Sequence, residues 1–109
     1  MKISEKYTYR VSWSEEDQEH VGLCAELPSL SWLAKTKEEA LHGISSLVDQ
    51  VLKDLEANRE ELPEPLSIKK YSGKFQVRIP PQIHRKLDIE AHEAKISLNR
   101  LVSAKLASG

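Results

Sequence analysis

Hydrophobic and polar residues alternate along the first part of the chain with the period of β-strands. The segment Tyr7–Trp13 places an aromatic or β-branched residue at every second position, which predicts a half-buried strand. The run Ser14–Asp17 follows as an acidic turn, and His20–Leu27 predicts a second strand. We expect the two strands to form an antiparallel hairpin, with Leu30–Ala34 as a shorter third strand.

The period then changes to that of an amphipathic helix. Thr36 and Glu39 fit a capping box, in which the Thr36 hydroxyl accepts from the Glu39 amide and the Glu39 carboxylate reaches back to the Thr36 amide. Apolar residues recur after this cap at steps of three and four, at Ala40, Leu41, Ile44, Leu47, Val48, Val51, Leu52 and Leu55. The pattern predicts a helix from Lys37 to about Asn58 that packs on the sheet. We expect the prolines in residues 59–65 to break it.

Strict alternation returns over Lys74–Ile79 and predicts another strand. One of its faces carries Phe75, Val77 and Ile79, and the other carries Lys74, Gln76 and Arg78. Two helices should follow. Pro80 and Pro81 open the first, which has an apolar line at Ile83, Leu87, Ala91 and Ala94 and stops near Lys95. Ser97 caps the second, with Ile96 and Leu101 as its hydrophobic staple and a buried stripe at Leu98, Leu101, Val102 and Leu106.

These elements predict an α+β protein with two domains. Residues 1–62 should form a small antiparallel sheet with one packed helix, residues 63–71 a linker, and residues 72–109 a strand–helix–helix module. Charge divides at the same place. Residues 1–62 carry 7 Lys and Arg against 13 Asp and Glu, a net charge of −6, whereas residues 63–109 carry 9 against 4, a net charge of +5. The second half is therefore expected to meet a polyanion, and the first half either to avoid a polyanion or to meet a basic partner.

Composition excludes several other classes. With 39% hydrophobic and 30% charged residues and no apolar run near the roughly 20 residues of a membrane span, we expect a globular, cytoplasmic protein without membrane contact. The start at Met1–Glu5 does not have the pattern of a secretory signal. Cys24, the single cysteine, excludes an internal disulfide and is expected to be a small buried residue. His84 and His92 are expected to be surface residues, and we expect no metal or other cofactor.

The lone strand Lys74–Ile79 requires a partner strand, since so small a module cannot satisfy its backbone alone. The simplest source is the same strand of a second chain, which gives a homodimer, or a tetramer where two dimers bind side by side. A two-stranded ribbon fits the major groove of DNA, so Lys74, Gln76 and Arg78 are the expected base contacts. The alternative is that these three side chains are only the solvated face of an edge strand.

The start of the second helix is the expected phosphate site. Ser97, Leu98 and Asn99 open that helix, where unpaired amides and the positive end of the helix dipole favour an anion. Lys86 and Arg100 lie on the helices and are further candidates for phosphate contacts.

Several motifs resemble the HicB family of antitoxins. The segments Ser72–Pro80, Ile83–Arg85 and Ile96–Val102 resemble its C-terminal ribbon-helix-helix of the Arc/MetJ type. The front of the chain is similar to the family's N-terminal domain, which has a partial RNase H-like fold, at Ser14–Asp17, Val21-Gly22, Glu26–Pro28 and Thr36–Leu41. The chain departs from the family at Ala34-Lys35, where Gly-Asp usually precedes the capping threonine.

The resemblance implies a type II toxin–antitoxin role. Residues 1–62 would block a small basic HicA-like toxin, an mRNA-cleaving ribonuclease, while residues 72–109 bind the operator and repress the shared operon. One alternative is an orphan repressor without a toxin. Another is a nuclease, suggested by the RNase H-like sheet. We do not expect an enzyme, because Glu15, Glu16 and Asp17 are consecutive in a turn and point in different directions.

Overall fold

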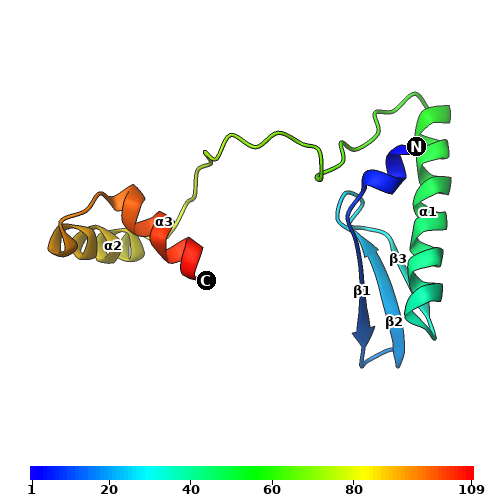
Figure 1. The fold of residues 1–109 in the computed structure, drawn as a ribbon, viewed down its shortest axis with the longest axis horizontal. Helices are drawn as coiled ribbons and strands as arrows, with labels where there is room; N and C mark the ends of the chain where they lie inside the picture. The colour runs from blue at the N-terminus through cyan, green and yellow to red at the C-terminus, as the bar shows by residue number, and fades with distance from the viewer. The chain divides into compact units, whose positions relative to one another are not determined.

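The computed structural model describes residues 1–109, which divide into two compact units (Figure 1). We call Met1–Tyr71 the N-terminal unit and Ser72–Gly109 the C-terminal unit. The N-terminal unit contains the short 3-10 helix η1 (Ile3–Lys6), the strands β1 (Tyr9–Ser14), β2 (Glu19–Cys24) and β3 (Ser31–Ala34), and helix α1 (Lys37–Ala57). The C-terminal unit contains the helices α2 (Pro81–Ala94) and α3 (Leu98–Ser108). This content confirms the predicted α+β class.

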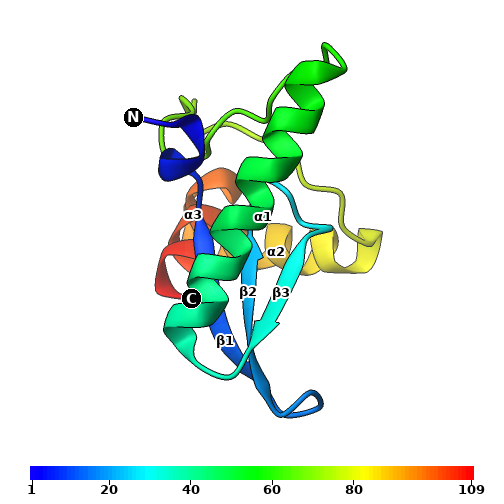
Figure 2. The ribbon, with the colours of Figure 1, turned by 90° about the vertical axis from the view of Figure 1, so that its right-hand side faces the viewer.

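The three strands form one antiparallel sheet in the order β1-β2-β3. The β1–β2 hairpin pairs Tyr9 with Cys24 at one end and Ser14 with Glu19 at the other. Helix α1 lies across one face of the sheet (Figure 2). The small antiparallel sheet with one packed helix is therefore confirmed. None of the helices combines the length and apolarity that a membrane crossing requires.

The core of the N-terminal unit lies between α1 and the sheet. Its buried side chains are Tyr7, Cys24, Ile44, Val48 and Leu52. Gly22 allows the helix to approach closely, because a Cβ atom there would lie 2.6 Å from the carbonyl oxygen of Ala40. Cys24 is 1% exposed, which confirms the prediction of a buried cysteine. Burial also raises the pKa of its thiol.

Strand β2 ends at Cys24, three residues before the predicted Leu27. The chain turns there, since the Leu27 amide donates to the Cys24 carbonyl at 3.2 Å. The Glu26 side chain turns with it and accepts from the Thr8 amide at 2.8 Å. Strand β1 begins two residues later than predicted, and β3 begins one residue later than predicted. The hydrophobic pattern thus located the strands but not their ends.

Helix α1 begins as predicted and ends for a different reason. The Thr36 hydroxyl accepts from the Glu39 amide at 3.1 Å, which confirms the N-cap. At the other end Arg59 adopts a left-handed conformation with φ 56°. The Glu60 amide then donates to the Leu55 carbonyl at 2.9 Å, which closes the helix. The prediction that prolines break the helix was wrong, because the chain reverses before it reaches Pro63.

The segment 63–67, which we call the strap, is bonded to the N-terminal unit. Three hydrogen bonds attach it: Tyr7 Oη to the Pro63 carbonyl (2.8 Å), the Leu66 amide to Glu26 Oε2 (2.9 Å), and Ser67 Oγ to the Lys6 carbonyl (2.6 Å). Pro65 within the strap is buried. The first residues of the predicted linker therefore lie on the N-terminal unit.

Replacing Glu26 by glutamine is expected to destabilise the N-terminal unit by about 1 kcal/mol at pH 7, because a single amide oxygen replaces a charged acceptor shared by Thr8 and Leu66. Burial opposes ionisation of Glu26, but the hydrogen bonds from these two amides hold its pKa below the ordinary value. The stabilisation is therefore present above the unfolded-state pKa and is lost as the pH falls through the folded-state pKa.

Urea unfolding followed by tryptophan fluorescence measures this effect, since Trp13 and Trp32 both lie in the N-terminal unit. The difference in free energy of unfolding between the wild type and the Glu26→Gln variant should disappear at acidic pH. Glu64→Gln is the matched control, because Glu64 is exposed and makes no hydrogen bond or ion pair. An equal loss in both variants would contradict the role of Glu26.

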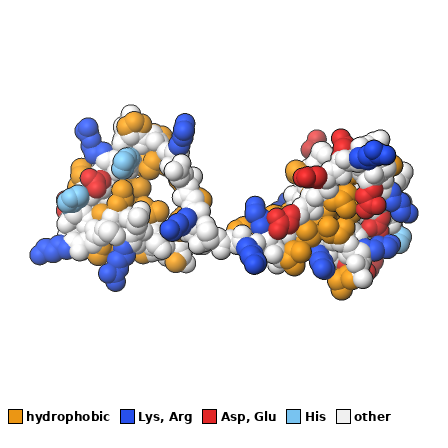
Figure 3. Space-filling model, turned by 90° about the horizontal axis from the view of Figure 1, so that it is seen from above, with side chains coloured by type: hydrophobic (Ala, Val, Ile, Leu, Met, Phe, Trp, Pro, Cys, Tyr) orange, Lys and Arg blue, Asp and Glu red, His pale blue; other side chains and the backbone are white.

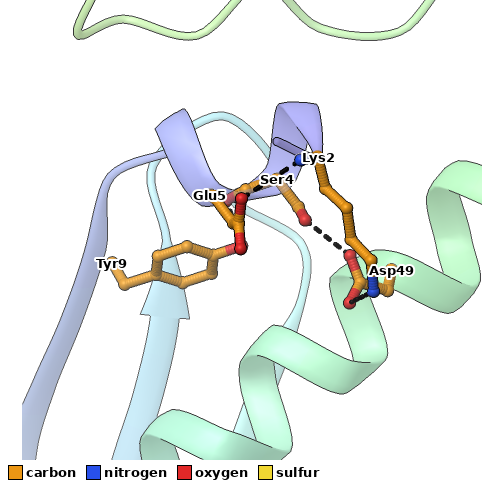
Figure 4. A network of polar contacts seen from close by, with 5 residues as sticks. All are labelled: Lys2, Ser4, Glu5, Tyr9 and Asp49. Atoms are coloured by element: carbon orange, nitrogen blue, oxygen red, sulfur yellow. Dashed lines mark hydrogen bonds and ion pairs between the residues drawn. The ribbon is translucent and has the colours of Figure 1, made fainter.

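Helix η1 is held against α1 by a polar network around Asp49 (Figure 4). Ser4 Oγ donates to Asp49 Oδ1 at 2.6 Å, and the Lys2 ammonium lies 3.6 Å from Asp49 Oδ2. The Lys2 amide donates to Glu5 Oε2 at 3.1 Å, and Tyr9 Oη donates to the Ser4 carbonyl at 2.9 Å. Burial raises the pKa of the Tyr9 hydroxyl to about 12. The start of the chain is thus part of the N-terminal unit.

The two helices of the C-terminal unit lie where the sequence predicts them. Pro81 occupies the first turn of α2, and Lys95 closes that helix in a left-handed conformation with φ 59°. The Ser97 hydroxyl accepts from the Arg100 amide at 3.0 Å, which confirms the predicted cap of α3. Lys105 and Glu90 form an ion pair of 3.1 Å between the helices, although such partly exposed pairs contribute little stability.

Candidate functional site

The segment Lys74–Ile79 carries an unpaired apolar face. No strand is formed there in the single chain, because no neighbouring strand supplies the hydrogen bonds of a ladder. Phe75 is 77% exposed, Val77 65% and Ile79 39%. Three apolar side chains at alternating positions of the sequence are therefore exposed to solvent in the single chain.

The helices that follow this segment in the sequence also bury few of their apolar side chains. In the whole C-terminal unit only Ala91 (2% exposed) and Leu101 (8%) are buried hydrophobic residues. Ile83, Ile89 and Leu106 on α2 and α3 are exposed. So little burial cannot offset the conformational entropy lost by ordering Ser72–Gly109. Most of the apolar surface of the C-terminal unit is therefore uncovered in the single chain.

The predicted base contacts lie on the opposite side of the segment from these apolar residues in the alternating pattern. Lys74, Gln76 and Arg78 are all exposed, and none forms an ion pair. The Lys74 amide donates to Ser72 Oγ at 3.0 Å, which orders the turn before the segment. Two basic side chains and one amide are thus free for an external ligand, and their contact with bases remains a prediction.

The predicted phosphate contacts lie at the exposed start of α3 and on α2. The Ser97 hydroxyl is used by the Arg100 amide, while the amides of Leu98 and Asn99 belong to the first turn and have no carbonyl partner within the helix. Lys86 and Arg100 are exposed and form no ion pair. Each of these five residues offers a donor or a positive charge, and their contact with phosphates remains a prediction.

Both units carry basic side chains, but acidic side chains are concentrated on the N-terminal unit (Figure 3). Lys and Arg side chains project from the C-terminal unit on the left, whereas many Asp and Glu side chains gather on the N-terminal unit on the right. The sequence has no Asp or Glu from Pro65 to Leu87, a stretch that holds six Lys and Arg residues. This stretch begins before the predicted strand, so Lys69 and Lys70 were missed as candidate ligand contacts.

The N-terminal unit exposes aromatic side chains that sequence reasoning placed only as strand residues. Trp13 and Trp32 are both about half exposed. The Trp13 indole N–H donates to Glu15 Oε2 at 2.7 Å, and this bond holds the pKa of the Glu15 carboxyl below its ordinary value. The indole of Trp32 lies directly against Gly43, where no Cβ atom could be placed. Gly43 within an otherwise regular helix was the sequence signal for this contact.

Two carboxylates of the acidic hairpin turn, those of Glu15 and Asp17, accept hydrogen bonds from neighbouring side chains. Gln18 Nε2 donates to Glu15 Oε1 at 3.2 Å, and Ser14 Oγ donates to Asp17 Oδ2 at 2.8 Å. No group of three or more His, Cys, Asp or Glu side chains is placed to hold a metal ion. These carboxylates therefore shape the turn and give the surface its negative charge.

Residues 55–106 match the model of the HicB family. This match supports the predicted relation to that family, whose members are generally antitoxins of toxin–antitoxin systems. The matched segment includes the last residues of α1, all of α2 and most of α3, and it leaves residues 1–54 outside. No curated protein and no solved structure was found to match the chain.

Proposed function

With the match of residues 55–106 to the HicB family as the premise, we propose that this protein is a non-catalytic antitoxin of a type II toxin–antitoxin system. Its N-terminal unit neutralises a HicA-like mRNA interferase, and its C-terminal unit represses the operon as a ribbon-helix-helix dimer. The observation that carries the proposal is the segment Lys74–Ile79, where an uncovered apolar face alternates with a free basic and polar one.

A second copy of the same segment would complete the C-terminal unit. Antiparallel pairing across a twofold axis satisfies both backbones and brings Phe75, Val77 and Ile79 of both chains together against the helices. The exposure of these residues, and the near absence of a core in one copy, support this arrangement. The protein is then a homodimer, and two dimers on repeated half-sites form a tetramer.

The opposite face of the paired ribbon suits the major groove of DNA. Arg78 and Lys74 have the reach and donors to bind guanine edges, and Gln76 matches adenine. The Leu98 and Asn99 amides, with Lys86 and Arg100, then hold the phosphate backbone and fix the register. The net positive charge of residues 63–109 supports a polyanionic ligand.

The charge of the N-terminal unit supports a basic protein as its partner. Residues 1–62 carry a net charge of −6, and the exposed Trp13 and Trp32 are of a kind enriched at protein interfaces. Charge complementarity of this type accelerates association and makes it sensitive to salt.

A second candidate is an orphan repressor with no toxin. The family match favours it in one respect, because residues 1–54 lie outside the matched segment. In this alternative the N-terminal unit serves dimerisation or senses a ligand, and only DNA binding is retained.

Co-expression with the product of the adjacent gene distinguishes the two candidates. We expect the neighbouring product to co-purify with the full chain, and residues 1–71 alone to relieve its toxicity, because the strap belongs with the N-terminal unit. The association rate should fall as salt rises. The fragment 72–109 is the matched control and should bind no toxin. Protection by 72–109 but not by 1–71 would reverse the assigned roles, and no co-purification would favour the orphan repressor.

A further inference from the structure

Basic residues begin before the ribbon segment. Lys69 and Lys70 precede Lys74 in the long stretch from Pro65 to Leu87 that contains no Asp or Glu. Neither lysine forms an ion pair, and both are exposed. Two positive charges that precede the proposed DNA-binding strand in the sequence thus have no acidic partner within the chain.

The hydrogen bonds that attach the strap to the N-terminal unit end just before Lys69 and Lys70. A final turn begins within the strap, where the Pro65 carbonyl accepts from the Ile68 amide at 3.3 Å and from the Lys69 amide at 3.1 Å. Beyond this turn, residues 70–73 make no backbone hydrogen bond to another segment. We call residues 68–73 the arm. It is an exposed segment attached at one end to the strap and at the other to the ribbon segment.

The arm has the chemistry of a backbone contact and not of a base reader. The Lys69 ammonium lies 5.6 Å from the centre of the Tyr71 ring, a cation–π distance that restrains the side chain. Tyr71 is 68% exposed, so its hydroxyl is free to donate to an anion. Lysine ammonium groups act as compact point charges that suit phosphate, whereas a basic toxin would be repelled by them.

From these observations we infer that the arm is an additional DNA-binding element, in which Lys69 and Lys70 contact backbone phosphates beside the ribbon. The inference rests on the proposed DNA binding of the C-terminal unit and extends its footprint toward the N-terminal side. The contacts carry no sequence preference, so they contribute equally to binding of operator and of random DNA.

Salt-dependent binding of the full chain to a fluorescein-labelled duplex of random sequence tests the arm. The double variant Lys69→Ala/Lys70→Ala should reduce the slope of log affinity against log salt by up to about 3.6, because each lost phosphate contact removes about 0.9 and a dimer carries four of these lysines. The variant Lys69→Arg/Lys70→Arg should retain the wild-type slope.

Lys35→Ala/Lys37→Ala is the matched control, because it removes the same charge from exposed, unpaired positions of the N-terminal unit. Its slope should remain that of the wild type. If the arm variant and this control give the same slope on random DNA, while Arg78→Ala still weakens binding to a duplex from the chain's own promoter, the arm is overturned and the proposed ribbon stands. A wild-type chain that binds no duplex, random or from its own promoter, overturns both.

Discussion

Replacing Phe75 by alanine is expected to convert the proposed dimer to monomers at micromolar concentration and to cost about 3–5 kcal/mol of dimer stability. In the single chain Phe75 is 77% exposed, so its side chain stabilises almost nothing there. Its whole contribution depends on burial against the second copy. Light scattering across a concentration series measures the change, and operator binding should fall with it.

The control for this prediction lies on the same segment. Gln76 occupies the opposite face, so Gln76→Ala should leave the dimer intact while it alters DNA binding. A wild-type protein that remains monomeric at micromolar concentration, or a Phe75→Ala variant that dimerises as well as the wild type, would contradict ribbon pairing through this face.

Arg78→Ala is expected to weaken operator binding by about 1–3 kcal/mol and to relax the preference at one base position. The reason is geometric. A guanidinium can form two hydrogen bonds to one guanine, so its removal affects the preference at that base pair and at no other. Competition between operator and random duplexes measures the change, and random DNA should be affected much less.

Lys86→Ala and Arg100→Ala are the comparison variants. Both residues are exposed on helices and are proposed to contact phosphates, so either change should weaken operator and random DNA about equally and lower the salt slope by about 1 per contact. If Arg78→Ala lowers the affinity for operator and for random DNA by the same factor, the ribbon acts only as a general electrostatic contact.

Helices and their caps were predictable because they depend on neighbours in sequence. Thr36 and Ser97 each accept a hydrogen bond from the amide three residues later, and the residue types alone indicated both caps. The apolar stripe of α1 likewise has a period that only a helix places on one face. The strand predicted for Lys74–Ile79 is not formed in the single chain, so the placement of Lys74, Gln76 and Arg78 opposite Phe75 stays a prediction.

By itself, the sequence determined the class of the fold, the starts of the helices, the buried Cys24 and the division of charge between the two halves. Only the tertiary structure decided where β2 ends, how α1 closes and that the strap belongs to the N-terminal unit. The physical reason is the separation of the groups involved: Glu26 and Leu66 form their hydrogen bond 40 positions apart. Such a bond depends on how the sheet and α1 pack, which no local pattern of residues encodes. The segment Lys74–Ile79 forms no strand in the single chain, and the pairing proposed for it would likewise depend on groups that the local sequence does not supply.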